Sequence, residues 1–227
     1  MKEITPKNSR YIPFTQQPSC CVPACISMIM YKRGIPLIPQ EELGYYLGLV
    51  VSKENEHFFY KLRAGKRPVS GYGTQIYKDE YNPNNVFPKL GIPLEMIFHP
   101  IDEFKDVKEL ENFISQQIKK DADMLICFDH GELKGSHEQG GHVCVIDRIF
   151  LKNGEIRLID PQRNQPKWRT VKAEDLYKAM KFHGSDKMSG VWEFEFAQEF
   201  ADKELVARGV KKVLDEYGEV IKKLGEN

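Results

Sequence analysis

A cluster of three cysteines near the N-terminus, Cys20, Cys21 and Cys25, contains the residue best placed to act as a nucleophile. Pro23 has no backbone N–H, so it is tolerated only in the first turn of a helix, and the helix that runs on to Arg33 cannot begin much before Cys20. Cys21 therefore falls at or just before the first helical residue. There the free N–H groups and the positive end of the helix dipole favour the thiolate, the reactive form of cysteine.

The other two thiols of the cluster have weaker claims. Cys25 shares a helix face with Met28 and Ile29, and we interpret it as a small buried hydrophobic residue. Cys20 points about 100° away from Cys21 on a helix, and we rank it second as the reactive thiol. The alternative that all three cysteines simply pack in a core stays open.

A nucleophilic cysteine needs a base, and the base needs a group that orients it. His142 opens the apolar segment HVCVIDRIF, and Asp160 ends the next apolar segment, just before Pro161. Between the two segments stands Lys-Asn-Gly, which is typical of a hairpin turn because Asn-Gly tolerates positive φ. Paired strands would bring both side chains to one edge of a sheet, so we predict a Cys21–His142–Asp160 triad.

Two further groups are placed to meet a substrate. Gln16 and Gln17 precede the nucleophile, and a side-chain amide with the backbone N–H of Cys21 would supply the two donors that a tetrahedral intermediate requires. We favour Gln16 for this oxyanion role. Gly140 and Gly141, just before the predicted base, leave room for a substrate backbone or only shape a loop.

The remaining histidines carry less information. His130 and His137 lie in the loop before His142 and can border a cleft. No partner pattern surrounds His57, His99 or His183. A zinc site built from the cysteine cluster and the loop histidines is an alternative, but the spacing is not that of a Cys-x2-Cys knuckle. We expect neither a metal nor a cofactor.

The composition places the chain among ordinary globular proteins. It has 227 residues, 41 % of them hydrophobic and 29 % charged, which argues against disorder and against a fibrous repeat. Lys+Arg 33 balances Asp+Glu 33, so composition does not call for a nucleic-acid partner, and we expect none.

Compartment and membrane association can be addressed from the same sequence. The longest apolar run, residues 25–31, is much shorter than the roughly 18 residues of a membrane helix. The N-terminal residues lack the charged start and apolar stretch of a secretory signal. The five cysteines are odd in number and clustered, unlike a disulfide framework. We expect a cytoplasmic protein with no membrane partner.

The order of the predicted elements indicates an α+β fold, with helices first and mostly antiparallel strands after them. Helices are predicted over residues 20–33, 40–51, 56–62, 86–90, 107–120 and 173–182. Strands are predicted over 93–98, 124–128, 142–151, 155–160 and 190–196, with a loop over 129–141.

The chain divides into one domain over residues 1–198 and a C-terminal extension over 199–227. Apolar residues at helical spacing predict a long amphipathic helix over 200–224. Its apolar stripe can dock on the chain's own domain, which we favour, or on a second copy of the chain, which would make a homo-oligomer.

The stretch TQQPSCCVPACISMIM, the strand GGHVCVIDRI and the pair Asp160-Pro161 together resemble the papain-like cysteine peptidase superfamily. The likeness is closest to freestanding relatives of the peptidases that process double-glycine bacteriocin leaders. Those carry Gln, a short spacer and then Asp-Cys-Gly-x-Ala-Cys-Leu-x-Met, which aligns the family nucleophile with Cys21, its second cysteine with Cys25 and its methionine with Met28. The resemblance covers roughly residues 11–196.

The resemblance implies a papain-like fold and a thiol hydrolase. The nucleophile would lie at a helix N-terminus in an N-terminal helical part, and a C-terminal antiparallel sheet would carry His142 and Asp160. Such an enzyme cleaves a peptide or isopeptide bond of a peptide or protein substrate through an acyl-enzyme. The chain shows no transporter membrane segment, so the bacteriocin-export role does not carry over.

The sequence departs from the family pattern at two positions. Val22 stands where the family has glycine, and Thr15 stands where it has the oxyanion glutamine. Phytochelatin synthases share the same layout, so an acyl or γ-glutamyl transferase that uses the same triad is one alternative. A catalytically inactive papain-like binding domain is another, supported only by these two departures.

Overall fold

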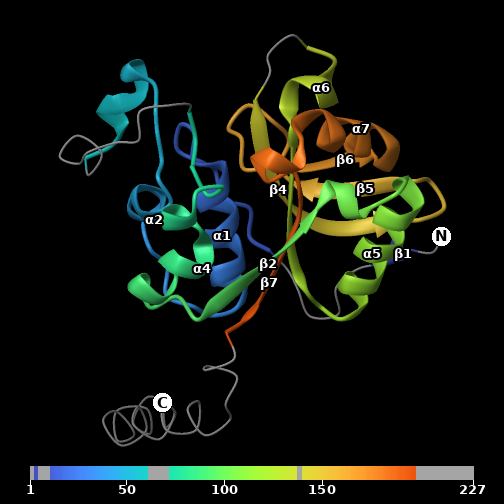
Figure 1. The fold of residues 1–227 in the computed structure, drawn as a ribbon, viewed down its shortest axis with the longest axis horizontal. Coiled ribbons are helices and arrows are strands. Elements are labelled where there is room, and N and C mark those ends of the chain that lie inside the picture. The colour runs from blue at the N-terminus through green and yellow to red at the C-terminus, as the bar shows by residue number, and fades with distance from the viewer. Residues whose placement is uncertain (1–2, 5–10, 61–71, 137–139, 198–227) are drawn as a thin grey trace, which may run out of the picture.

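The protein has an α+β fold built on an antiparallel sheet (Figure 1). The computed structural model describes residues 3–4, 11–60, 72–136 and 140–197. Within these ranges the strands are β1 (Glu3–Ile4), β2 (Leu94–Pro100), β3 (Asp123–Asp129), β4 (Gly141–Phe150), β5 (Glu155–Ile159), β6 (Trp168–Lys172) and β7 (Gly190–Phe196). The helices there are α1 (Cys21–Lys32), α2 (Gln40–Tyr46), α4 (Pro83–Val86), α5 (Val107–Lys119), α6 (His130–Lys134) and α7 (Ala173–His183). Short 3-10 turns lie at Lys53–Phe58, Asp79–Tyr81, Pro88–Leu90, Ile101–Glu103 and Ser185–Lys187.

The strands that the structure describes pair in the order β2-β7-β3-β4-β5-β6, with β1 added to β4. Every neighbouring pair is antiparallel. Figure 1 shows α1, α2 and α4 on one side of the molecule, α5, α6 and α7 on the other, and β2 and β7 between them. The predicted α+β class is therefore confirmed.

Both faces of the sheet are covered, and the central strand β3 is buried along its whole length. Its side chains alternate between two hydrophobic cores, as the period of a strand requires. Leu125 and Cys127 belong to the core that contains α1, whereas Ile126 and Phe128 belong to the core that contains α5 and α7. The sheet is thus a partition between two packed layers.

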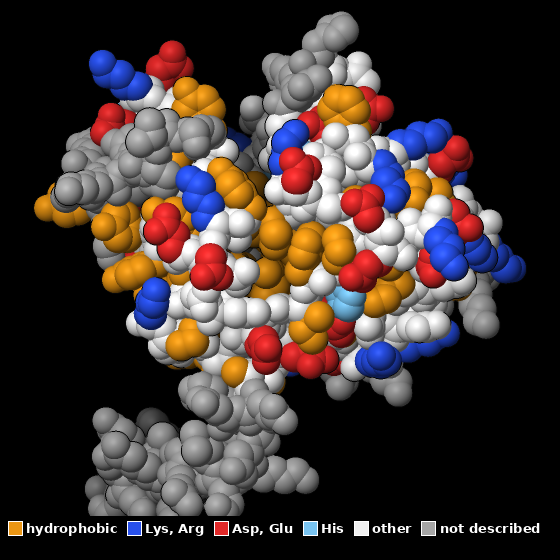
Figure 2. All heavy atoms as spheres, viewed as in Figure 1, with side chains coloured by type: hydrophobic (Ala, Val, Ile, Leu, Met, Phe, Trp, Pro, Cys, Tyr) orange, Lys and Arg blue, Asp and Glu red, His pale blue; other side chains and the backbone are white. Residues whose placement is uncertain are grey.

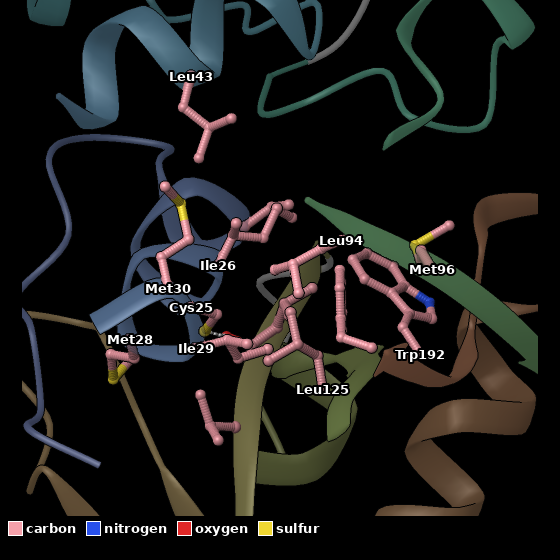
Figure 3. Close-up of a cluster of buried hydrophobic side chains, with 14 of the residues drawn as sticks. Cys25, Ile26, Met28, Ile29, Met30, Leu43, Leu94, Met96, Leu125 and Trp192 are labelled. Atoms are coloured by element: carbon pink, nitrogen blue, oxygen red, sulfur yellow. Dashed lines mark hydrogen bonds between the residues drawn. The ribbon is translucent and has the colours of Figure 1, made fainter. Parts of the chain in front are cut away.

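Helix α1 is held deep in the first of these cores (Figure 3). It is buried from Val22 to Met30, and Pro23 occupies its first turn as the sequence requires. The thiol of Cys25 is fully buried and donates a hydrogen bond to the carbonyl oxygen of Val143 on β4, with a sulfur–oxygen distance of 3.4 Å. The interpretation of Cys25 as a small buried residue is confirmed.

A buried carboxylate fastens the far end of α1 to the sheet. Asp123, at the start of β3, is fully buried and accepts hydrogen bonds from the Tyr11 hydroxyl, from Lys32 Nζ and from Arg33 Nε. Burial, with the Asp123 carboxylate beside it, raises the pKa of Tyr11 well above its usual range, so the phenol keeps the proton that it donates. These contacts join the N-terminal segment, the helix and the central strand.

The second predicted helix, over residues 40–51, is too long. The helix ends at Tyr46 because Gly48 adopts a left-handed φ of 71°, which turns the chain away. Leu49 then folds back on Gly44, where an added Cβ would lie 2.8 Å from a methyl carbon of Leu49. The apolar residues that suggested a longer helix are buried through this turn instead.

Strand β6 and helix α6 are among the elements that the sequence prediction missed. Strand β6 lies at an edge of the sheet beside β5, and its side chains are exposed or half-buried, so it lacks the apolar face that marks a strand. Helix α6 is a single short stretch inside the predicted loop over 129–141. The predicted helix over 200–224, the extension over 199–227 and His137 lie outside the described residues.

The surface carries charges of both signs. On the face drawn in Figure 2 they are interspersed, and apolar side chains gather where β2 and β7 cross the view. These two strands contribute the exposed side chains of Ile97 and Phe196. In the described ranges, no helix combines the length and the apolar character that a bilayer crossing requires.

The buried carboxylate predicts a large stability effect. Asp123→Ala leaves Lys32, Arg33 and the Tyr11 hydroxyl without their shared acceptor, so we expect the free energy of unfolding to fall by about 3–5 kcal/mol. Asp175→Ala, at an exposed position of α7, should cost less than about 1 kcal/mol. Denaturant unfolding of both variants checks this, and equal losses would contradict the anchoring role of Asp123.

Candidate active site

Cys21 is the first residue of α1, as predicted from Pro23. Its side chain is half-buried and lines a cavity of about 310 Å³. The wall of this cavity is formed by residues 72–77 together with side chains from β3, β4 and β7 and the end of α7. Cys21 is therefore the member of the N-terminal cysteine cluster that faces an open volume.

Cys20, the second-ranked thiol, lies in a different environment. It is fully buried in a small core with Leu49, Val51 and Phe59. Burial raises the pKa of its thiol far above the usual range. A neutral, inaccessible thiol is a poor nucleophile, so the structure favours Cys21 over Cys20.

The predicted base and its orienting group are in direct contact. The Nε2 atom of His142, on β4, lies 2.8 Å from Oδ1 of Asp160, which directly follows β5. Both side chains are buried, His142 at 5 % exposure and Asp160 at 0 %. The turn between β4 and β5 makes this contact, because pairing of Val145 with Ile159 sets the two strand ends side by side.

The thiol of Cys21 is among the groups that raise the pKa of His142. The structure therefore brings His142 and Asp160 together from a strand and a strand end. The participation of Cys21 in a triad with them stays a prediction. Because Asp160 occupies Nε2, Nδ1 is the ring nitrogen left to face a thiol. This arrangement has the order of groups that general-base activation of a nucleophile requires.

Asp160 is stabilised as a carboxylate by three donors. Besides His142, the backbone N–H of Gln162 donates to Oδ1 at 2.9 Å, and Arg169 Nη1 donates to Oδ2 at 3.1 Å. Burial alone would raise the pKa of Asp160, but these hydrogen bonds lower it to about 2. The group is therefore ionised throughout the physiological range.

His142 is shifted in the opposite direction. Burial disfavours its charged form, but the Cys144 thiol and the hydrogen bonds to Asp160, Cys144 and Cys21 outweigh burial and raise the pKa of His142 well above its usual range. The imidazole consequently keeps its second proton at neutral pH and is a charged neighbour of Asp160.

Aromatic rings enclose the imidazole on its other sides. Phe128 and His130 meet the His142 ring edge-on, with ring centroids 5.8 Å and 4.9 Å away. Burial and the neighbouring charge of His142 lower the pKa of His130 to about 4, so this second ring stays neutral. His130 thus shields the base from water without competing for its proton.

Gly141 has a specific steric role. An added Cβ there would lie 2.7 Å and 2.8 Å from Nε2 and Cε1 of His183, so the missing side chain is the space that the His183 ring fills. Both residues line the Cys21 cavity. Gly140 has open space around it. Of the two glycines, only Gly141 is required by packing.

Gln16 and Gln17 occupy a second hollow, of about 250 Å³, together with Gln162 and Asn164. The backbone N–H of Gln16 donates to the carbonyl oxygen of Pro161 at 2.9 Å, which places Gln16 next to the Asp160 turn. The side-chain oxygens of all three glutamines are buried and lack a hydrogen-bond partner among the described residues. Gln16 does not line the Cys21 cavity, and its oxyanion role stays a prediction.

Three site residues were missed by sequence reasoning. Cys144 is buried beside His142, and two-residue spacing along a strand was the signal that could have found it. Arg169 lies on the strand that had not been predicted. His183 reaches the cavity from the end of α7, and no local pattern marks such a contact.

The alternative zinc set of Cys20, Cys21, Cys25 and loop histidines does not converge in the described part of the chain. The described residues instead bring together possible ligand atoms of His142, Cys144 and Asp160, which all lie within 4.8 Å of one another. Comparison with known proteins adds no assignment, since no protein-family model and no curated protein matches this chain.

The lowered pKa of Asp160 predicts an acid-dependent loss of stability. A carboxyl group with a folded pKa of about 2 and an ordinary value of 3.8 stabilises the fold above pH 3.8 and loses that contribution as the pH falls to 2. We expect about 2 kcal/mol from this group. Unfolding free energies measured between pH 5 and pH 2 should fall less steeply in Asp160→Asn than in the wild type or in Asp175→Asn; parallel curves for all three would contradict the shift.

The contact between Gly141 and His183 predicts a rescue. Gly141→Ala should lower the free energy of unfolding by about 1–3 kcal/mol through overpacking, and Gly140→Ala should be nearly neutral. Adding His183→Ala to Gly141→Ala should recover most of the loss, because the clashing ring is gone. Thermal or denaturant unfolding completes the double-mutant cycle, and strict additivity would show that the ring is not the obstacle.

Proposed function

We propose that this protein is a papain-like, thiol-dependent hydrolase that cleaves a peptide or isopeptide bond through an acyl-enzyme on Cys21. The observation that carries the proposal is the buried hydrogen bond between His142 and Asp160. The half-buried thiol of Cys21 is among the groups that raise the pKa of the same imidazole. Two features recorded for the fold agree with it: a nucleophile at a helix start and an antiparallel sheet that carries the base.

Acylation uses these groups in a defined order. His142 holds the proton taken from Cys21 as an imidazolium, and the sulfur forms a bond to the carbonyl carbon of the substrate. The developing oxyanion is stabilised by the backbone N–H of Cys21, which has no partner within a helix that starts there, and by the side-chain amide of Gln16. The carbon–nitrogen bond then breaks, and His142 returns the proton to the leaving amine.

Deacylation repeats the sequence with water. His142 removes a proton from the water that attacks the thioester, and the thiolate of Cys21 leaves. Asp160 remains ionised throughout, holds the imidazole in one orientation and stabilises its charged form. Arg169 in turn holds Asp160 in place from the edge strand.

The cavity beside Cys21 suits an apolar part of a substrate. Ile76, Met188 and Trp192 contribute to its wall, and the exposed rings of Tyr72 and Tyr77 stand at the loop side. Pockets of this volume, with a mostly apolar lining, are typical of small-molecule or side-chain recognition. A peptide with an apolar side chain near the scissile bond fits these walls.

Val22 is the structural feature that bears on the alternative of a catalytically inactive binding domain. In this chain Val22 is 3 % exposed, packs in the core beneath α1 and also forms part of the cavity wall. It therefore narrows the space next to the nucleophile, where the resembling peptidases have glycine. Reactivity of the thiol itself separates an enzyme from a binding domain.

Alkylation by iodoacetamide at about pH 6 tests the proposal. A thiol with an ordinary pKa near 8.5 is well under 1 % ionised there. We expect Cys21 to be labelled before the four buried cysteines, and the rate to fall about a hundredfold in His142→Ala because the base is lost. Peptide mass spectrometry locates the label.

His57→Ala, which removes an exposed histidine far along the chain from the triad, serves as the control and should label at the wild-type rate. Labelling of Cys21 that is slow at this pH and indifferent to His142→Ala would favour the binding-domain alternative and contradict a catalytic thiol.

A further inference from the structure

Cys144 is a buried thiol beside the triad that the hydrolytic mechanism does not use. It lies two residues after His142 on β4 and is fully buried. Its sulfur, a ring nitrogen of His142 and a carboxylate oxygen of Asp160 all lie within 4.8 Å of one another. A thiol, an imidazole and a carboxylate at this separation are the donors that tetrahedral zinc takes from proteins.

We propose that the triad doubles as a binding site for a thiophilic divalent cation such as Zn²⁺, with Cys144, His142 and Asp160 as ligands. Zinc bonds are roughly 2.0–2.3 Å long, so the ligand atoms around one ion lie closer together than 4.8 Å. Small side-chain movements would bring these three atoms to bonding distance of one ion. Cys21, which also raises the pKa of His142, is the candidate for the fourth position.

The charges around the site select the kind of metal. The ionised carboxylate of Asp160 attracts a cation. Its Oδ2 atom, however, accepts a hydrogen bond from Arg169, and the positive guanidinium repels a cation. The gain must therefore come from the bond to sulfur. Soft thiolate donors favour Zn²⁺ over Mg²⁺ or Ca²⁺, which prefer oxygen ligands. On binding, the S–H bond of Cys144 and the N–H bond at the coordinating nitrogen of His142 break. The freed electron pairs form the bonds to zinc, and both protons pass to solvent.

The effect of the metal on the reactivity of Cys21 rests on the proposed function, whereas metal binding itself does not. A cation on His142 occupies the imidazole that would accept the proton of Cys21, so the metal acts as a reversible inhibitor of the nucleophile. A chelator then restores the free base. The site would make the activity sensitive to the supply of zinc.

Competition between the full-length chain and a chromophoric chelator for Zn²⁺ alone measures the site without any substrate. We expect one zinc ion per chain, an apparent affinity about a hundredfold weaker in Cys144→Ser, and no competition by Mg²⁺. Cys25→Ser is the matched control, because it removes an equally buried thiol that is bonded to the carbonyl oxygen of Val143 instead, and it should bind zinc as the wild type does. Wild-type affinity in Cys144→Ser, or no binding by the wild type, overturns the proposal.

Cobalt spectroscopy keeps the test decisive if Cys144→Ser fails to fold. In Cys21→Ala the nucleophile is gone but Cys144 remains, so a Co²⁺ adduct should still show a thiolate-to-cobalt charge-transfer band. Absence of that band would place the metal on Cys21 and refute the role of Cys144. Zinc occupancy is read out even if Cys21 proves unreactive to iodoacetamide, so failure of the metal site and failure of the proposed hydrolase are distinguishable.

Discussion

The hydrogen bond between His142 and Asp160 is the interaction on which the arrangement of the site depends. A carboxylate that is fully buried must be paired, because an isolated charge in the interior costs far more than the fold can supply. Asp160 meets this requirement with the imidazole, the backbone N–H of Gln162 and Arg169. The antiparallel ladder β4-β5-β6 fixes the two side-chain partners. The ladder therefore determines where the base lies and which of its nitrogens is free.

A separate contact between α1 and strand β4 positions the nucleophile. Cys25 lies one helical turn after Cys21, and its thiol is bonded to the carbonyl oxygen of Val143, the residue next to His142. This contact links the helix and the strand close to where thiol and imidazole meet. The Asp123 cluster secures the other end of the helix, so α1 is held at both ends against the same sheet.

The parts of this site that follow from local rules could be predicted from the sequence. Pro23 determines where α1 begins, and the Asn-Gly turn brings His142 next to Asp160, because both signals act over a few residues. Arg169 and His183 could not be found in this way. Arg169 lies on an edge strand without an apolar face, and His183 meets Gly141 only because α7 packs beside β3, the strand that pairs with β4. For Gln16, the sequence shows only that a glutamine precedes the nucleophile. The direction of its side-chain amide depends on the loop around Pro161, whose carbonyl oxygen accepts from the backbone N–H of Gln16.

The central claim is that Cys21, His142 and Asp160 form one electrostatic unit, and nitrogen NMR of ¹⁵N-histidine-labelled protein tests it most directly. The account predicts that the His142 ring stays doubly protonated well above an ordinary histidine pKa of about 6.5, and that capping Cys21 as a methyl disulfide lowers this pKa. A His142 that titrates near the ordinary value, and that does not respond to the state of Cys21, would contradict the account.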